Sequence, residues 1–200
     1  QVGEDSKNVE SNINELKTLH GLNDITFMNQ THSNIVLKVS KENTHLDCDA
    51  MFTEDKTVSC AVLTADCIPI LVTESSGRMI GCIHAGWRGL QSKIIENFFS
   101  KFKSISKSNF RVLLGPCISA QNYEVSDEIF CQFSNYSDRF RKNKSGNYYM
   151  DLRYIACDIL NELGITNVTI SKSCTYNDNF YSYRKDKTTG RFVSLIWFKK

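Results

Sequence analysis

The spacing of apolar residues predicts a chain of short strands mixed with amphipathic helices. Apolar residues recur at three- and four-residue intervals over residues 6–20, which predicts an amphipathic helix that ends at Gly21. From Val58 onward the chain is strongly apolar and breaks into short runs typical of buried strands. We expect strands over 35–39, 58–63, 68–73, 79–84, 110–114, 168–171 and 191–198, and further helices over 89–102, 125–133 and 151–163.

The order of these elements favours one fold class. Strands and helices alternate imperfectly, and pairs of adjacent strands stand between helices; residues 75–77 form the expected turn of one such pair. This order favours an α+β fold, with mixed β-sheets and outer helices, over a uniform winding of parallel strands. The 200 residues are close to the usual size of one domain, so we expect a single domain over residues 1–200.

Composition and charge exclude several classes of protein. Apolar residues make up 41% and charged residues 23%, a balance typical of globular proteins. The formal net charge is +2, which lacks the concentrated basic field that nucleic acids and anionic membranes require. No apolar run approaches the roughly 20 residues that cross a bilayer. We therefore expect neither nucleic acid nor a membrane as a partner.

The chain contains eight cysteines, which is an unusually high number, and none of them forms a C-x-x-C pair. Cys60 and Cys82 lie inside apolar runs, where a free cysteine behaves as a small hydrophobic residue. A chain of this length can build a core without disulfide bonds. We therefore expect reduced thiols and a cytoplasmic protein.

Two of the four histidines stand in motifs that secondary-structure propensity does not explain. His32 precedes a predicted strand, and His84 lies at the end of another. Between them, Cys67 lies where Thr, Asp and Cys interrupt an apolar stretch. If these segments converge, two imidazoles and a thiolate match a catalytic zinc site with one open position. Copper accepts the same donors, and each residue alone is also compatible with a place in the core.

Two further segments are candidate ligand-binding sites. The glycines of residues 86–89 allow close backbone approach at an expected helix start, where Arg88 can bind a phosphate. The alternative is a glycine-containing turn with a surface arginine. Residues 180–186, which include Arg184, mix aromatic and cationic side chains that could stack on a base and bind ribose or phosphate. The alternative there is a structural edge.

A series of motifs along nearly the whole chain carries a family resemblance. In order, the motifs are QTHSNIV, DCDAMFT, LTADCIPIL, IHAGWRGL, LGPCISAQNYEV, the Asp151-Leu152 helix start and CTYNDNFYSYRKDKTTGRFVSLIW. The series closely resembles the YfiH/YlmD-type family, formerly described as multicopper polyphenol oxidases or the laccase domain. The resemblance implies a zinc-dependent purine nucleoside phosphorylase that cleaves adenosine, inosine or guanosine with phosphate. It also implies adenosine deaminase and methylthioadenosine phosphorylase activities, and a two-sided β assembly with outer helices and an internal pseudo-twofold.

The resemblance also implies roles for individual residues. Matched by motif, the metal ligands of the family fall on His32, Cys67 and His84, the same three residues reached above from residue type. Cys117 and Arg184 match suspected pocket residues. Members of the family usually carry a further stretch before the segment that residues 1–5 resemble. We therefore expect that an N-terminal segment contributing to the substrate site is missing from this chain.

For phosphorolysis, we expect zinc to orient phosphate or water, with Arg88 holding the phosphate. Asp66, beside Cys67, is the candidate for a carboxylate that handles a proton or orients a ligand, whereas Asp49 is expected to bond backbone N–H groups of a loop. One alternative is a copper-binding polyphenol oxidase, although four histidines cannot supply both a blue-copper centre and a multicopper cluster. The other is a cysteine-dependent hydrolase with Cys67 or Cys117 as its nucleophile.

Overall fold

The computed structural model describes residues 5–42 and 46–199, so residues 1–4 of the segment compared with the family lie outside the described residues. The strands are β1 (Asp24–Phe27), β2 (Val36–Lys38), β3 (Ala50–Thr53), β4 (Val58–Thr64), β5 (Ile68–Glu74), β6 (Ile80–Ala85), β7 (Phe110–Leu114), β8 (Glu124–Val125), β9 (Phe140–Lys142), β10 (Tyr148–Met150), β11 (Val168–Ile170) and β12 (Phe192–Ile196). The helices are α1 (Ser6–His20), α2 (Trp87–Gln91), α3 (Ile94–Ser100), α4 (Asp127–Cys131), α5 (Leu152–Glu162) and α6 (Tyr183–Asp186).

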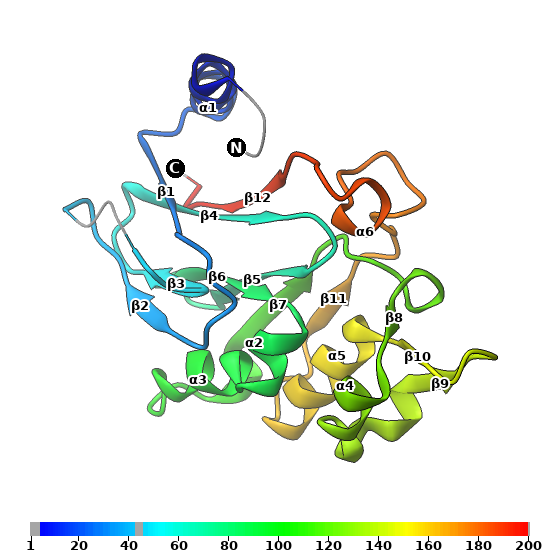
Figure 1. The fold of residues 1–200 in the computed structure, drawn as a ribbon. Helices are drawn as coiled ribbons and strands as arrows, with labels where there is room; N and C mark the ends of the chain where they lie inside the picture. Colours follow the sequence, from blue (N-terminus) through cyan, green and yellow to red (C-terminus); the bar gives the residue numbers. More distant parts are fainter. Residues whose placement is uncertain (1–4, 43–45, 200) are drawn as a thin grey trace.

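The described strands form three sheets (Figure 1). The largest has six strands in the order β11-β7-β5-β6-β3-β2, and two three-stranded sheets have the orders β1-β4-β12 and β8-β10-β9. The largest sheet is mixed: β5 pairs antiparallel with β6 and β7, whereas β2 pairs parallel with β3. The α+β class with mixed sheets is thereby confirmed. The internal pseudo-twofold and the single domain over residues 1–200 stay predictions.

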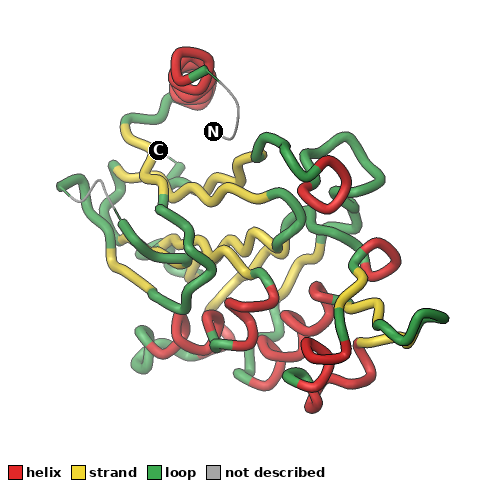
Figure 2. Tube along the Cα trace, in the orientation of Figure 1, coloured by secondary structure: helices red, strands yellow, loops and turns green. Residues whose placement is uncertain are grey.

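The six-stranded sheet is covered on both faces (Figures 1 and 2). Helices α2, α3 and α5 cover one face, and the sheet β1-β4-β12 lies over the other. Successive residues of β6 point to opposite faces, as the pleat of a strand requires. Ile83 packs in the larger core with Phe98 of α3, whereas Cys82 packs in a smaller core with Val62 of β4. The sheet therefore forms the central layer of the protein.

Several predicted elements have the expected bounds. Helix α1 covers residues 6–20 and ends at Gly21 in the left-handed conformation with φ 62°. Strand β7 covers residues 110–114. The predicted strand pair that turns at residues 75–77 is observed as the antiparallel hairpin β5–β6. Periodicity located these elements because each is either long or bounded by a glycine-containing turn.

The prediction of one helix over 89–102 is wrong, because the segment forms the two helices α2 and α3. Lys93 lies between them in the left-handed conformation with φ 68°. The hydroxyl of Ser92 bonds the carbonyl oxygen of Arg88 at 2.8 Å and that of Gly89 at 3.3 Å. These bonds satisfy carbonyl groups at the end of α2, so the chain turns there before α3 begins.

Other differences come from short elements that pair with distant residues. The predicted helix over 125–133 is observed only as the shorter α4, because Glu124 and Val125 pair with β10 as strand β8. Strands β1, β3, β9 and β10 and helix α6 have three or four residues each and were not predicted. Elements of this length carry too few residues for a periodic pattern, and strand pairing stabilises them instead.

The burial of the cysteines agrees with the hydrophobicity of the sequence around them. Cys60 and Cys82, from apolar runs, are fully buried. Cys131 is exposed, and all eight cysteines are free thiols in the structure. Burial of free cysteines in a core agrees with their behaviour as small hydrophobic side chains.

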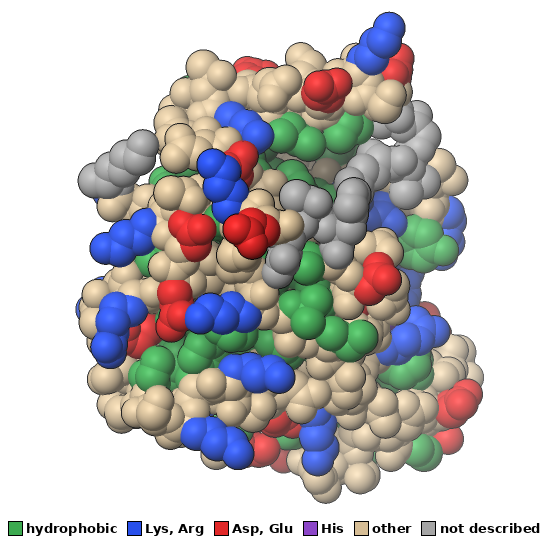
Figure 3. All heavy atoms as spheres, turned by 90° about the vertical axis from the view of Figure 1, so that its left-hand side faces the viewer, with side chains coloured by type: hydrophobic (Ala, Val, Ile, Leu, Met, Phe, Trp, Pro, Cys, Tyr) green, Lys and Arg blue, Asp and Glu red, His purple; other side chains and the backbone are tan. Residues whose placement is uncertain are grey.

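The surface shown in Figure 3 carries a mixture of charges. Cationic and acidic side chains are interspersed over this face, with apolar side chains between them. The mixture agrees with the nearly balanced formal charge of the sequence. Among the described residues, no helix combines the length and apolarity that a membrane span requires.

Candidate metal centre and its cavity

Three side chains from separate segments meet at one point, and we refer to them as the ligand trio. His32 follows β1, Cys67 lies in the turn that joins β4 to β5, and His84 lies near the end of β6. One imidazole nitrogen or sulfur atom of each lies within 4.8 Å of the other two. The Nε2 atom of His32 is 3.9 Å from the Sγ atom of Cys67. The structure thus brings together the three ligands predicted from the sequence.

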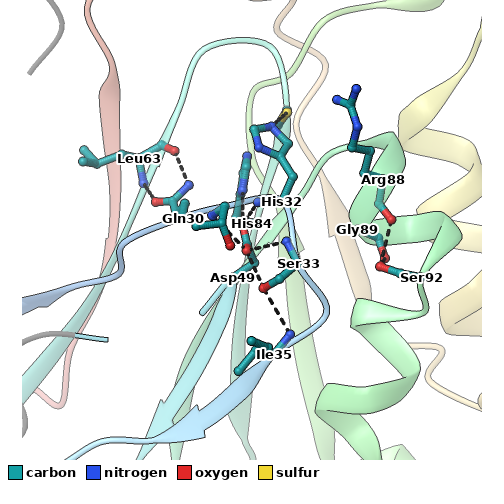
Figure 4. Close-up of polar contacts among 12 residues, drawn as sticks. Gln30, His32, Ser33, Ile35, Asp49, Leu63, His84, Arg88, Gly89 and Ser92 are labelled. Carbon is teal, nitrogen blue, oxygen red and sulfur yellow. Dashed lines mark hydrogen bonds and ion pairs between the residues drawn. The ribbon is translucent and has the colours of Figure 1, made fainter. Parts of the chain in front are cut away.

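The ligand trio lies where two sheets meet. β1 and β4 belong to the three-stranded sheet, whereas β5 and β6 belong to the six-stranded sheet. The side chain of Gln30 helps to fix the loop before His32, since its amide donates to the carbonyl of Leu63 at 2.7 Å and accepts from the N–H of Leu63 at 2.9 Å (Figure 4). The side chain of Gln30 thus bonds β4 beyond Phe27 and Ala61, the last backbone pair of β1 with β4, on the side toward the site.

Unusual backbone conformations position two segments of the site. His32 has φ 61° and Asp66 has φ 97°, both in the left-handed region that costs a non-glycine residue about 1–2 kcal/mol. Gly86, two residues after His84, packs against Cys67 and His32 of the ligand trio. A Cβ atom at Gly86 would lie 2.8 Å from the Sγ atom of Cys67 and 3.2 Å from the Cδ2 atom of His32. A side chain at this position would therefore displace Cys67 and crowd His32.

Asp49 is a fully buried carboxylate beside the trio (Figure 4). Its Oδ1 atom lies 2.7 Å from Nδ1 of His84 and accepts the N–H of His32 at 3.0 Å. Its Oδ2 atom accepts the N–H groups of Thr31 at 3.1 Å and Ser33 at 2.6 Å, and also the hydroxyl of Ser33 at 2.7 Å. Asp49 thus bonds the loop N–H groups as the sequence predicted. Its contact with His84 was missed, because residue spacing gives no sign of it.

Cys67, His84 and Asp49 have strongly perturbed pKa values. Burial acts to raise the pKa of Cys67, but His84 and His32 outweigh it and lower that pKa to about 6. Burial acts to lower the pKa of His84, but Cys67 and Asp49 raise it to about 9. Burial acts to raise the pKa of Asp49, but hydrogen bonds from His84 and Ser33 lower it to about 2. At neutral pH, the trio therefore contains a thiolate, the form of cysteine that binds metals.

The ligand trio lines a cavity of about 1240 Å³. Aromatic and cationic side chains gather on its walls together with the trio. The aromatic residues are Phe27, Trp87, Tyr123 and Tyr183, and the cationic residues are Arg88, Arg184, Lys187 and Arg191. Such a mixture suits a ligand that combines a flat ring with an anionic group.

The structure brings both predicted arginines to this cavity. The Arg88 guanidinium lies 4.5 Å from the ring centroid of its neighbour Trp87. The Arg184 guanidinium lies 4.9 Å from the ring centroid of Tyr123 and donates from Nη1 to the carbonyl oxygen of Glu124 at 2.8 Å. Two more cations line the cavity, and both lie close after Arg184 in the sequence: Lys187 and Arg191.

Asp66 also lines the cavity, and both oxygens of its carboxylate have donors. Oδ1 accepts the hydroxyl of Thr175 at 2.7 Å, and Oδ2 accepts the backbone N–H of Arg184 at 2.6 Å. The backbone carbonyl of Asp66 accepts the N–H of Ile118 at 3.0 Å. The residue before Cys67 therefore bonds three residues that are distant in the sequence.

Cys117 is not brought to the cavity. It is fully buried, and its Sγ atom accepts the Nε–H of Arg153 at 3.4 Å. Burial raises the pKa of Cys117 to about 11, against the lowering effect of Arg153. A thiol in this setting is protonated at neutral pH, so the geometry does not favour Cys117 as a nucleophile.

Comparison with known proteins finds relatives along the whole chain. Residues 1–199 match the family model described as multi-copper polyphenol oxidoreductase laccase. The purine nucleoside phosphorylase of Haemophilus influenzae is 33% identical over 207 residues, which cover 99% of this chain and 84% of the relative. The purine nucleoside phosphorylase YfiH of Escherichia coli K12 is 34% identical over 178 residues, which cover 86% of this chain and 72% of the relative.

Solved structures share the fold. The Neisseria meningitidis protein NMB0706 superposes with a TM-score of 0.92 at 33% identity, covering all of this chain and 85% of that one. YlmD from Geobacillus stearothermophilus superposes with a TM-score of 0.93 at 26% identity, covering all of this chain and 83% of that one. The arrangement of sheets and helices described above is therefore similar to that of these structures.

Proposed function

From the membership of this chain in the family that includes YfiH and YlmD, we propose that it is a zinc-dependent purine nucleoside phosphorylase. Its substrates are a purine nucleoside (adenosine, inosine or guanosine) and inorganic phosphate, and its products are the free base and ribose 1-phosphate. Relatives about one-third identical to the chain carry the name of this activity.

One observation carries the proposal: the ligand trio opens into a cavity that also holds aromatic and cationic side chains. A purine has flat faces that aromatic rings can stack on, and phosphate is an anion that arginine binds with two parallel N–H groups. Both reactants therefore find chemically matched groups beside the same candidate metal centre.

The residues of the trio fit zinc. His32, Cys67 and His84 offer two imidazoles and one thiolate, a donor set that zinc accepts while keeping a fourth position open. Asp49 bonds the Nδ1 atom of His84, which leaves Nε2 to face the other two donors. When bound, zinc supplies a Lewis acid that polarises an oxygen atom.

The remaining steps fall to the residues around the trio. In phosphorolysis, the bond between C1′ and the base breaks and the base leaves with the electron pair. A phosphate oxygen forms the new bond to C1′, and the proton that phosphate loses goes to the leaving base. Arg88 holds the phosphate and reduces the repulsion between its charge and the electron-rich leaving base. Trp87, Tyr123 and Tyr183 bind the base, and Arg184 binds ribose or phosphate. Asp66 keeps Arg184 beside Cys67.

Product analysis tests this function. The zinc-loaded protein is incubated with inosine or adenosine, with and without phosphate, and the products are separated by chromatography. We expect free base only when phosphate is present, together with ribose 1-phosphate. Release of base without phosphate would identify a hydrolase instead, and absence of any product with each purine nucleoside would contradict the proposal.

The same assay tests two finer activities. Inosine formed from adenosine, with or without phosphate, identifies adenosine deamination. Adenine formed from methylthioadenosine only with phosphate identifies methylthioadenosine phosphorolysis. We propose both as activities of the same cavity, since each uses a purine nucleoside and the same groups around the trio. If adenosine gives no inosine, the proposal of deaminase activity is wrong. If methylthioadenosine gives no adenine, the proposal of methylthioadenosine phosphorylase activity is wrong.

A cysteine-dependent hydrolase is the second candidate, favoured by one observation. The Cys67 thiolate lies beside two imidazoles, an arrangement that also activates a nucleophile. A thiolate bound to zinc is not free to attack, so metal analysis of protein purified without chelators separates the two candidates. About one zinc per chain supports the phosphorylase, copper supports the oxidase alternative, and activity that survives chelation but not alkylation supports the hydrolase.

A further inference from the structure

We propose that Asp49 is the positioning residue of the metal centre: one carboxylate orients both histidine ligands, His32 from the loop between β1 and β2 and His84 from β6. This inference rests on the metal site of the proposed function. It goes beyond the ligand trio, because Asp49 contacts no substrate and is not itself one of the three donors.

The first half of the argument concerns His84. Its Nδ1 atom lies 2.7 Å from Oδ1 of Asp49, and both side chains are buried. This contact fixes the rotation of the ring and assigns Nδ1 to the carboxylate. The Nε2 atom then faces Cys67 and His32, whose ligand atoms lie within 4.8 Å. Without the carboxylate, the ring could present either nitrogen to the metal.

The second half concerns His32. This residue adopts a left-handed conformation with φ 61°, which an isolated chain disfavours. The N–H groups of Thr31, His32 and Ser33 all point to the Asp49 carboxylate, at 3.1, 3.0 and 2.6 Å. Three successive N–H groups around one anion form a nest, which fixes the backbone of all three residues. The carboxylate therefore stabilises the strained conformation that directs His32 toward Cys67.

Asparagine cannot replace this carboxylate. An amide has one accepting oxygen and one NH2 group, whereas the site presents four donors in Thr31, His32 and Ser33, besides the ring of His84. The NH2 group of Asp49→Asn must face an N–H or O–H donor on one side. We therefore expect the loop of His32 to loosen, or the ring of His84 to turn.

The test measures metal affinity rather than turnover. Metal-free wild type and Asp49→Asn are titrated with Zn²⁺ against a chromogenic chelator, and Co²⁺ is added separately to record its visible absorption spectrum. We expect Asp49→Asn to bind zinc roughly 10–100-fold more weakly and to show an altered cobalt spectrum. The matched control is Glu74→Gln, because Glu74 is a buried carboxylate that binds only the turn of its own hairpin. This control is expected to keep the wild-type affinity and spectrum.

Different outcomes separate the two levels of the proposal. If Asp49→Asn has a lower melting temperature but unchanged zinc affinity and cobalt spectrum, Asp49 is merely structural and the inference is wrong. If the wild type itself binds neither metal, the metal site of the proposed function is wrong, and the inference with it. If Asp49→Asn does not fold, Ser33→Ala replaces it, since this variant removes one hydroxyl donor to Oδ2 and keeps the charge. A several-fold loss of affinity in Ser33→Ala supports the inference, and unchanged affinity overturns it.

Discussion

The carboxylate of Asp66 accepts the backbone N–H of Arg184 at 2.6 Å, across 118 positions of sequence. Its other oxygen accepts the hydroxyl of Thr175, which is fully buried. One side chain beside Cys67 therefore holds the C-terminal segment, defined as residues 174–191, against the candidate metal centre. This segment carries three of the four cations that line the cavity: Arg184, Lys187 and Arg191.

Asp66→Asn is expected to release this segment. An amide cannot accept from both Thr175 and Arg184 with equal geometry, and hydrogen bonds to a charged group contribute about 1.5–3 kcal/mol each. We expect faster proteolysis within residues 174–191 and a higher KM for the nucleoside, measured by limited digestion and steady-state kinetics. Thr175→Val, which removes only one bond, should show a smaller effect. Equal resistance to proteolysis in wild type and Asp66→Asn would contradict this role.

His84→Ala is expected to abolish stoichiometric zinc binding, because it removes one of the three donors. It also removes the contact of the imidazole ring with Oδ1 of Asp49. Asp49 keeps its four donors from the loop of His32, so the variant should stay folded with a lower melting temperature. Elemental analysis gives the zinc content, and circular dichroism gives the fold. His20→Ala, on the exposed end of α1, is the control with unchanged zinc. Retention of one zinc per chain in His84→Ala would show that His84 is not a zinc ligand.

Arg88→Ala is expected to raise the KM for phosphate roughly 10- to 150-fold, with a much smaller change in the KM for the nucleoside. The guanidinium lines the cavity, and a charge-assisted bond to phosphate contributes about 1.5–3 kcal/mol. Initial rates measured with each substrate varied in turn separate the two constants. Arg78→Ala, on the exposed turn of the β5–β6 hairpin, is the control. Equal increases in both constants would show that Arg88 does not hold the phosphate.

Gly86→Ala is expected to weaken zinc binding without unfolding the protein. The added methyl group would lie 2.8 Å from the sulfur of Cys67, so this ligand or the backbone must move by several tenths of an ångström. Gly81→Ala creates a contact of 2.7 Å with the carbonyl oxygen of Met51 in the middle of the sheet, and serves as the comparison. We expect Gly81→Ala to lower the melting temperature and keep its zinc. A Gly86→Ala protein with wild-type zinc affinity would disprove the close approach.

The pH dependence of alkylation tests the charge state of Cys67 in the metal-free protein. The pKa of Cys67 is lowered to about 6, so its thiolate dominates above that pH and is lost as the pH falls through 6. Iodoacetamide should therefore modify Cys67 at a rate that rises to a plateau above pH 6, with the site identified by mass spectrometry. In His84→Ala the rise should move to higher pH, because the imidazolium that favours the thiolate is gone. A rate that rises only near pH 9 in the wild type would refute the lowered pKa.

The sequence predicted the ligand trio because its residues are chemically conspicuous. Each residue alone was also compatible with a place in the core, and the family motifs selected the same three residues. The α+β class was predicted from the order of strands and helices along the chain. Long or glycine-bounded elements such as α1 and the β5–β6 hairpin were equally visible.

The parts that sequence reasoning missed depend on contacts rather than on residue type. The bonds of Asp49 to loop N–H groups were predicted, but its contact with the imidazole of His84 was not. Asp66 was noticed for its place beside Cys67, yet its partners lie more than a hundred residues away. The break at Lys93 reflects a local left-handed turn that helical periodicity does not report.

The ligand trio lies at the junction between the six-stranded sheet and the sheet β1-β4-β12, and this placement has a consequence for the lifetime of the protein. An ion held by all three side chains is a cross-link between layers, so separating the layers requires releasing the ion. If this ion is zinc, as proposed, the folded form gains stability with the logarithm of the free zinc concentration above the dissociation constant. Under the proposed function, removal of zinc is therefore expected to lower the resistance of the folded chain to proteases.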